Sequence, residues 1–249
     1  MGRQRWTGGV VVQTRGEVLD SARDYVRKQI AGLARKLPDR LVSARVKLVA
    51  FAKPSAPVPA LAQANLDVAG RAVRAQVAAA FFAEAGGLLR ARLREQVASL
   101  TGPRTFRPWR GAAPEVPAAR SRGPREIVRC KEFPLCRCDP AEAAFTMDLR
   151  DYDFHLFVDA DTGEDSVVYR AGPTGYRLAR LHSPVPPRDR PAVPLTVRPR
   201  PVPVESAAGA AAGLDRTELP FAFFRDHETG RGSVVYRRYD GHYGLITPA

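Results

Sequence analysis

The chain has 249 residues, of which 45% are hydrophobic and 26% charged, a composition that excludes fibrous and fully disordered proteins and fits one or two globular domains. Its 39 Lys and Arg residues outnumber 26 Asp and Glu residues, which gives a net charge of +13. The longest stretch without a charged residue spans 13 positions, 54–66, well short of the roughly 20 apolar residues of a membrane helix. No secretory signal is evident, and an odd number of cysteines, three, fits a reducing compartment, so we expect a cytoplasmic protein.

The positive charge is concentrated in the N-terminal part of the chain. Residues 1–100 contain 17 basic and 7 acidic side chains, a net charge of +10, and residues 101–125 add +5. Only five of the 39 basic residues are Lys, which indicates GC-rich coding, but such a bias exchanges Lys for Arg without creating net charge. A polyanion is the expected partner, because Lys and Arg that neutralise phosphates release condensed counterions.

Hydrophobic periodicity predicts six elements in the first 100 residues. They are a strand at 10–14, a helix at 20–37, a strand at 42–51, two strands at 62–68 and 71–77 joined through Ala69 and Gly70, and a helix at 80–100. Asp20 is expected to cap the first helix, and Gly86 and Gly87 weaken the second. The order β-α-β-β-β-α predicts an α+β domain with one four-stranded sheet and both helices on a single face.

Both helices carry cations away from their apolar stripes. These cations are Arg23, Arg27, Lys28 and Arg35 on the first helix and Arg90, Arg92 and Arg94 on the second. Charged helix faces are often merely solvated, but the regional excess of positive charge favours a joint RNA-binding ridge.

Two Pro-rich stretches divide the rest of the chain. Residues 101–125 carry five prolines and residues 182–213 carry eight, and both are predicted to be linkers. The predicted organisation is a domain at 1–100, a linker at 101–125, a first repeat at 126–181, a linker at 182–213 and a second repeat at 214–249.

The two C-terminal segments are an internal duplication. Residues 154–179 align without gaps to residues 221–246, and twelve of the 26 positions are identical at an offset of 67. Each repeat is predicted to be mainly β, with two strands joined by a Thr-Gly turn, and Asp240-Gly241 predicts a hairpin leading to a third strand. The predicted first strands are 154–159 and 221–226.

The predicted strands of the repeats are apolar on both faces, so each sheet must be covered on both. The second repeat, with 36 residues, is too short to fold alone and must pair with the first repeat or with the same repeat of another chain. The residues predicted to form this contact are Phe154, Leu156, Phe157, Val168, Tyr169, Phe221, Phe223, Phe224, Val235 and Tyr236.

No metal site is predicted. Cys130, Cys136 and Cys138 form C-x5-C-x-C, which matches no common zinc module even when His155 is added as a fourth ligand. The acidic turn after Asp159 hints at a calcium loop, but Arg170 stands where the bidentate Glu is required. A hairpin turn is the favoured interpretation.

Catalysis is not predicted either. The four histidines are scattered, and the sequence has no nucleophile motif, no P-loop and no HExxH. We therefore expect a protein that is not an enzyme and needs no cofactor or small-molecule substrate.

Segment 220–246, PFAFFRDHETGRGSVVYRRYDGHYGLI, closely resembles the C-terminal domain of long-form ribosome hibernation promoting factors. The N-terminal β-α-β-β-β-α domain is similar to their ribosome-binding domain in topology and charge. The matching positions are Phe221, Phe224, Asp226, Thr229, Gly230, Val234, Tyr236, Arg237, Asp240, Gly241, Tyr243, Gly244, Leu245 and Ile246.

The resemblance implies a translation inhibitor of dormancy or stress. Its N-terminal domain would bind the small ribosomal subunit and its rRNA and block the mRNA and tRNA sites. The rRNA-facing role would fall on the seven helix cations and also on Arg45, Lys47, Arg71 and Arg74.

The duplication departs from ordinary long forms, whose single C-terminal domain self-associates and joins two ribosomes. It is similar instead to the tandem variant of actinobacterial dormancy-associated factors. A 32-residue linker reaches roughly 30 Å, which favours pairing of the repeats within one chain and stabilisation of single ribosomes. The alternatives are a factor that dimerises ribosomes and a transcription-associated interaction protein.

Overall fold

The structure, a computed structural model, describes residues 9–37, 41–51, 59–101, 124–171, 175–182, 184–188, 193–217, 219–238 and 240–249. The elements divide between two compact units, the first with strands β1–β4 and helices α1 and α2, the second with strands β5–β14, helix α4 and helix α3 as far as Met147. Residues Asp148–Asp151 belong to the first unit. Within these ranges, every helix is too short or too polar to cross a bilayer.

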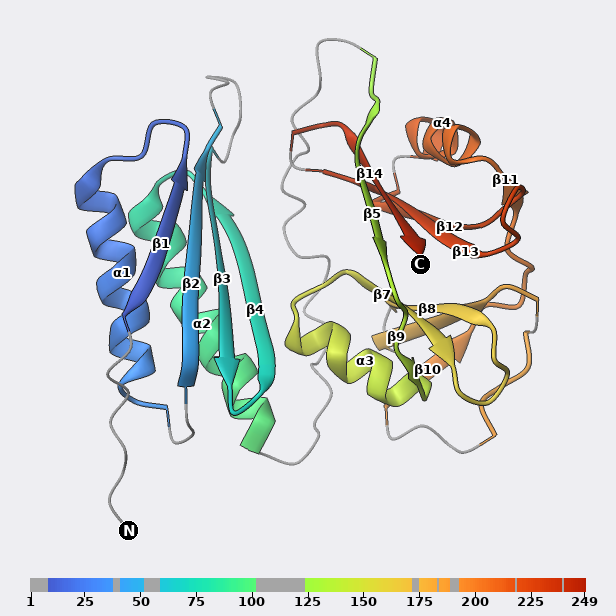
Figure 1. Ribbon diagram of the computed structural model, residues 1–249, viewed down its shortest axis with the longest axis horizontal. Helices are drawn as coiled ribbons and strands as arrows, with labels where there is room; N and C mark the ends of the chain where they lie inside the picture. Colours follow the sequence, from blue (N-terminus) through green and yellow to red (C-terminus); the bar gives the residue numbers. More distant parts are fainter. Residues whose placement is uncertain are drawn as a thin grey trace. The chain divides into compact units, whose positions relative to one another are not determined.

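The first unit has the predicted order of elements. They are β1 (Val10–Arg15), α1 (Asp20–Ala34), β2 (Leu41–Ala50), β3 (Ala60–Val68), β4 (Arg71–Ala79) and α2 (Phe82–Thr101). The strands form one sheet, sheet I, in the order β1-β2-β3-β4, with β1 parallel to β2 and the other neighbours antiparallel. Both helices cover the same face of this sheet, as predicted (Figure 1).

Alternation along β2 sets which residues of sheet I face the helices. Ala44, Val46 and Leu48 are buried, whereas Arg45 and Lys47 between them are exposed. Simple alternation would place Val42 on the buried side too, but it is 63% exposed and Leu41 is buried instead. The register between β2 and β3 shifts between Leu41 and Ser43, and such a shift reverses the alternation.

The connections follow local chemistry. Ala69 and Gly70 form the β3–β4 turn with positive φ angles of 52° and 82°, and the Gly70 amide donates to the Asp67 carboxylate at 2.9 Å. Asp20 does not cap α1, because the N-cap residue is Leu19, which has no side-chain oxygen to accept a hydrogen bond. Asp20 lies in the first turn and pairs with Arg23 at 3.2 Å.

The second unit contains two five-stranded sheets (Figure 1). Sheet II has the order β10-β9-β8-β7-β6, and sheet III has the order β11-β12-β13-β14-β5. The first repeat supplies β5 (Ile127–Phe133), β6 (Arg137–Cys138), α3 (Pro140–Leu149), β7 (Phe154–Asp159), β8 (Asp165–Ala171) and β9 (Gly175–Arg180). The second supplies β10 (Leu195–Val197), β11 (Val204–Glu205), α4 (Ala207–Thr217), β12 (Phe221–Asp226), β13 (Gly232–Arg237) and β14 (Tyr243–Pro248).

The second repeat begins earlier than the sequence analysis placed it. The stretch 182–213, predicted to be a linker, contains β10, β11 and most of α4. Short edge strands tolerate flanking prolines, and the Ala-rich run forms a helix because Ala210 and Leu214 pack against sheet III. The other predicted linker, 101–125, lies almost entirely outside the described residues.

The two repeats exchange their first strands. β5 is the first strand of the first repeat but pairs in parallel with β14 of the second, and β10, the first strand of the second repeat, pairs in parallel with β9 of the first. The register places Cys130 opposite Leu245 and Val197 opposite Leu178, which are equivalent pairs at an offset of 67. The edges of β9 and β14 are therefore occupied by a strand from the other repeat.

Each sheet has its own helix on its outer face. Phe157, Val168 and Tyr176 of sheet II pack with Met147 of α3. Phe224, Val235 and Tyr243 of sheet III pack with Leu214 of α4. The inner faces of the two sheets meet in a third cluster of buried residues, which includes Leu156 and Val167 of sheet II and Phe223 and Val234 of sheet III. The order of layers in the unit is therefore α3, sheet II, sheet III and α4.

Candidate functional site

Helices α1 and α2 of the first unit lie side by side and run in the same direction. Gly86 of α2 lies next to Tyr25 and Val26 of α1, and one turn further the Arg90 guanidinium donates to the Gln29 side chain at 3.0 Å. The glycine expected to weaken α2 thus allows the two helices to approach closely. Cations on both helices can consequently belong to one surface.

The helix cations differ in exposure and in local partners. Arg27, Lys28, Arg35 and Arg94 are exposed, and Arg90 is partly buried against α1. Arg27 also pairs with Asp24 at 3.3 Å, a contact between two half-exposed side chains that contributes little to stability. Exposed cations of this kind are available to phosphate oxygens. We call Arg27, Lys28, Arg90 and Arg94 the helix set.

Of the other predicted helix cations, Arg23 pairs with Asp20 and Arg92 pairs with Asp151. The four predicted strand cations are separated from the helix set. Arg45 and Lys47 are exposed on the face of sheet I that carries no helix, and Arg74 on the same face hydrogen-bonds to Gln63 and Gln76. Arg71 lies beside the β3–β4 turn. The eleven residues therefore occupy opposite sides of sheet I and cannot all contact one flat surface.

One exposed cation next to α1 was missing from the prediction. Lys36 follows Arg35 directly after α1 and is exposed. Its charge alone could have identified it.

The contact between the repeats is built from equivalent residues. The third cluster contains Leu156 and Phe223, and also Val167 and Val234, and the two residues of each couple are 67 positions apart. Phe154 and Phe221, also equivalent, have ring centroids 4.6 Å apart. Phe221 further contacts Tyr169 at 5.3 Å, and Phe154 contacts Tyr236 at 6.1 Å, so the aromatic contacts follow a local two-fold axis.

Most of the residues predicted for this contact lie on the inner faces of sheets II and III, but four do not. Phe154, Leu156, Tyr169, Phe221, Phe223 and Tyr236 lie in or beside the third cluster. Phe157, Val168, Phe224 and Val235 face the opposite way, into the helix–sheet cores. Both faces of each strand are apolar, so the sequence could not tell which face meets the other repeat and which meets a helix.

Polar groups complete the contact at one place. Asp165 at the start of β8 is 5% exposed and accepts hydrogen bonds from Arg231 Nε at 2.8 Å, Arg231 Nη2 at 3.2 Å and the Gly232 amide at 2.9 Å. The carboxylate holds the pKa of Arg231 above its usual value. All three donors belong to the second repeat.

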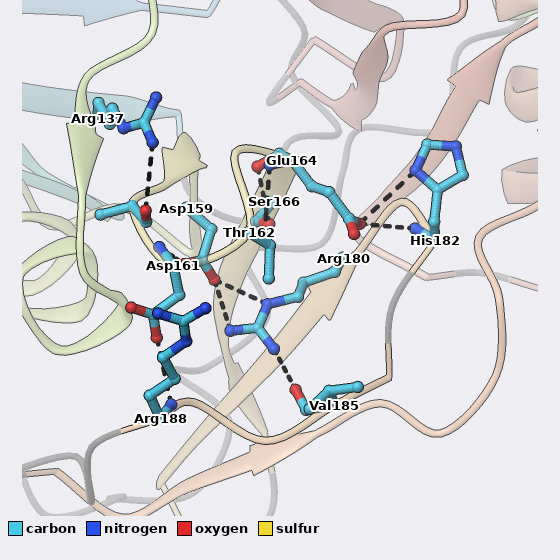
Figure 2. Close-up of polar contacts among 11 residues, drawn as sticks. Arg137, Asp159, Asp161, Thr162, Glu164, Ser166, Arg180, His182, Val185 and Arg188 are labelled. Carbon is cyan, nitrogen blue, oxygen red and sulfur yellow. Dashed lines mark hydrogen bonds and ion pairs between the residues drawn. The ribbon is translucent and has the colours of Figure 1, made fainter.

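A second polar cluster lies within the first repeat, at the β7–β8 turn (Figure 2). Arg180 and Asp159 form a buried ion pair, with Nε and Nη2 at 2.8 and 2.7 Å from the same carboxylate oxygen. Arg180 also donates to the Val185 carbonyl, and the Glu164 carboxylate accepts the His182 amide at 2.9 Å. These bonds attach the segment after β9 to the turn, which is a hairpin as the sequence analysis favoured.

The three cysteines differ in environment. Cys130 and Cys136 are exposed and Cys138 is buried. Burial, together with the neighbouring Cys136, raises the pKa of Cys138 to about 12. Among the residues that the structure describes, no three His, Cys, Asp or Glu side chains are grouped to hold a metal ion.

Comparison with known proteins identifies the family. The family model "Sigma 54 modulation/S30EA ribosomal protein C terminus" matches residues 122–178 and 196–245, one match for each repeat. The Mycobacterium tuberculosis (strain H37Rv) protein "Dormancy associated translation inhibitor" is 43% identical over 225 residues, 87% of this chain and 81% of the relative. The chain therefore belongs to the long-form ribosome hibernation factor family, which confirms the resemblance found in the sequence.

Other relatives match parts of the chain. The "Ribosome hibernation promotion factor" of Staphylococcus aureus (strain COL) is 43% identical over 53 residues, 21% of this chain and 28% of the relative. The solved "Thermus thermophilus Protein Y N-terminal domain" is 28% identical with a TM-score of 0.31, covering 37% of this chain and 99% of that chain.

Proposed function

We propose that this protein is a cytoplasmic ribosome hibernation factor that binds the small subunit through α1 and α2, blocks the mRNA and tRNA sites and inhibits translation during dormancy or stress. The observation that carries the proposal is the location of the helix set on two parallel, adjacent helices, with Arg27, Lys28 and Arg94 exposed. The relative that aligns along most of the chain bears the name of a translation inhibitor, which supports the same function.

Electrostatics favour rRNA as the surface that α1 and α2 contact. Residues 1–100 carry a net charge of +10, and each phosphate neutralised by Arg or Lys releases condensed counterions. Such binding is strong at low salt and weakens steeply as salt rises. The cations on the open face of sheet I are on the other side of the domain, so they serve as an internal comparison.

Charge reversal tests the helix surface. The variant R27E/K28E/R90E/R94E should lose ribosome binding by more than about 100-fold, and its binding should depend less on salt, by roughly one unit of log–log slope per lost phosphate contact. Sedimentation with purified small subunits at several salt concentrations measures both, with circular dichroism as the check on folding.

The control is R45E/K47E, which reverses two exposed cations on the opposite face of sheet I, and it is compared with R27E/K28E, which reverses two exposed cations of the helix set. The control should bind within a few-fold of the unchanged protein. If R27E/K28E/R90E/R94E still binds ribosomes, or if only the control loses binding, the helices are not the rRNA-binding surface. Recovery of RNA polymerase without rRNA from lysate would favour the transcription-associated alternative.

The proposal includes pairing of the two repeats within one chain. Three observations support it: the shared cluster between sheets II and III, the exchange of β5 and β10, and the 14 residues, 181–194, that connect β9 to β10. A connection of this length holds the second repeat near the first at an effective concentration on the order of millimolar. Pairing between chains is then disfavoured, and the factor acts on single ribosomes.

Light scattering and sucrose gradients test this part separately. We expect a monomer by light scattering and inhibited single ribosomes after stoichiometric addition of the protein. The appearance of ribosome dimers in proportion to added protein would reject intrachain pairing, while leaving the proposal of rRNA binding intact.

A further inference from the structure

Asp165 and Gly232 occupy the same position in the two repeats, 67 residues apart, and they contact each other. Contact between equivalent residues places this position on the local two-fold axis that relates Phe154 to Phe221. At such an axis, identical repeats would present identical residues to each other. Here the two residues differ, and so do the residues before them, Glu164 and Arg231.

The polar contact needs a carboxylate from one repeat and hydrogen-bond donors from the other. The Asp165 carboxylate is nearly buried and takes its three hydrogen bonds from Arg231 and the Gly232 amide. A nearly buried carboxylate needs such donors because its desolvation is otherwise uncompensated. The second repeat supplies the donors and no carboxylate of its own at this position.

Steric constraints agree with the electrostatics. A Cβ atom on Gly232 would lie 2.7 Å from the Cβ atom of Asp165 and 2.9 Å from the Phe223 ring, closer than side chains approach. Only one of the two axial positions can therefore carry a side chain. The equivalent of Phe223 in the first repeat is the smaller Leu156.

Pairing of like repeats would fail at this point. Two first repeats would place Asp165 against Asp165, with Glu164 where Arg231 now donates, and would bury carboxylates without a cation. Two second repeats would place Arg231 against Arg231 with no carboxylate between them. Positions that carry the same residue in both repeats, such as Val167 and Val234, cannot discriminate between these combinations.

We infer that the contact of Asp165 with Arg231 and Gly232 is a specificity determinant by which the first repeat accepts only the second repeat as its partner. The inference rests on the proposed pairing of the repeats and adds which partner the surface accepts. The partner that the first repeat accepts is a repeat with Gly at the axial position and Arg directly before it, either in the same chain or in another.

Three full-length variants test the determinant. The first, F223L/R231E/G232D, gives both repeats the Leu-Glu-Asp residues of the first repeat. The second, L156F/E164R/D165G, gives both repeats the Phe-Arg-Gly residues of the second. The third combines all six changes, so that the two sets are exchanged between the repeats.

We expect each of the first two variants to lower the melting midpoint of the C-terminal unit by about 8 °C or more, since the first leaves nearly buried carboxylates without a cation and the second places Arg against Arg with no carboxylate between them. The exchanged variant should recover at least half of that loss. Because Glu164 also accepts a hydrogen bond from the His182 amide, E164A serves as a control for the loss of that contact alone. The inference would be overturned if the exchanged variant lost as much stability as the first two variants lose when their losses are added. It would also be overturned if either of the first two variants were as stable as the unchanged protein.

Failure of the proposed pairing would be visible in a different measurement. If the unchanged protein proves to be a dimer by light scattering, pairing within one chain is wrong, but the recovery of the exchanged variant still reports whether unlike repeats select each other. If the protein is a monomer and the exchanged variant does not recover, only the determinant is wrong.

Discussion

Gly86 of α2 lies against Val26 of α1, so closely that a Cβ atom on Gly86 would be 3.1 Å from Val26 Cγ2. A Cβ atom on the next residue, Gly87, would have no neighbouring atom within 4 Å. Two adjacent glycines that look alike in the sequence thus have different roles, one in helix packing and one with no packing role.

We expect Gly87→Ala to stabilise the first unit by about 1 kcal/mol, because Ala has the higher helix propensity. Gly86→Leu should destabilise it by about 1–3 kcal/mol, since the larger side chain forces α1 and α2 apart. Denaturant unfolding measures both changes. Equal effects of the two substitutions would contradict the packing role of Gly86.

Truncating Phe154 or Phe221 should weaken the contact between the repeats. Their rings lie 4.6 Å apart, and we expect about 2–4 kcal/mol of destabilisation from Phe154→Ala or Phe221→Ala, with strong coupling between the two. A double-mutant cycle in the full chain measures that coupling. Phe81→Ala, at a 73% exposed residue in the first unit, is the control and should leave stability within about 0.5 kcal/mol.

Asp159 and Arg180 form an ion pair whose side chains are 0% and 1% exposed. Arg180→Met leaves the carboxylate buried without its cation and should cost about 3–5 kcal/mol. The double variant D159N/R180M removes both charges and keeps an acceptor for the turn, so we expect it to be more stable than R180M. Calorimetry compares the two, and a double variant less stable than R180M would contradict this account.

Acid should destabilise the second repeat through two aspartates. The Thr229 amide, as the main favourable contact, lowers the pKa of Asp226. Burial raises the pKa of Asp240, but hydrogen bonds from Arg238 and the His242 amide outweigh it and the net pKa is lowered. A lowered folded pKa gives stability that is present above the unfolded value, about 4, and is lost as pH falls through the folded value.

Urea unfolding between pH 6 and pH 2.5 checks this expectation. The variant D226N/D240N should be less stable than the unchanged protein at pH 6, and the difference should shrink as the pH falls. A difference that stays constant over the whole range would show that the two carboxylates do not contribute through their ionisation.

The three cysteines should react differently with an alkylating reagent. At pH 8 the Cys138 thiol is buried and protonated, because its pKa is raised to about 12, whereas Cys130 and Cys136 are exposed. Intact mass should show two rapid additions in the folded protein and a third only after unfolding. A third addition as rapid as the first two would place Cys138 at the surface.

Much of the fold follows from local patterns. The strands Phe154–Asp159 and Phe221–Asp226 were predicted to the residue, because each is a short, largely apolar run that a Thr-Gly turn follows. In contrast, β10 and β11 were missed because they have three and two residues and are surrounded by prolines. Such strands exist only because neighbouring strands of a sheet accept them, which no short-range pattern reports.

The candidate site was predicted as a set of residue types and not as a surface. Positions on the two helices can be projected from a 3.6-residue period, so the helix cations were found, with Lys28 among them. Arg45 and Lys47 were grouped with the helix cations, although the sheet separates the two groups. Only the packing of both helices on one face of sheet I reveals that separation.

The amino-acid sequence by itself determined the duplication, the basic N-terminal region and the α+β class, because identity at a fixed offset, charge and periodicity are properties of the chain. Tertiary structure decided which apolar face of each repeat meets the other, that β5 and β10 change places, and that Asp165 faces Gly232. These features depend on contacts between residues far apart in the chain, where many pairings satisfy the same local pattern and only packing and hydrogen bonding select one.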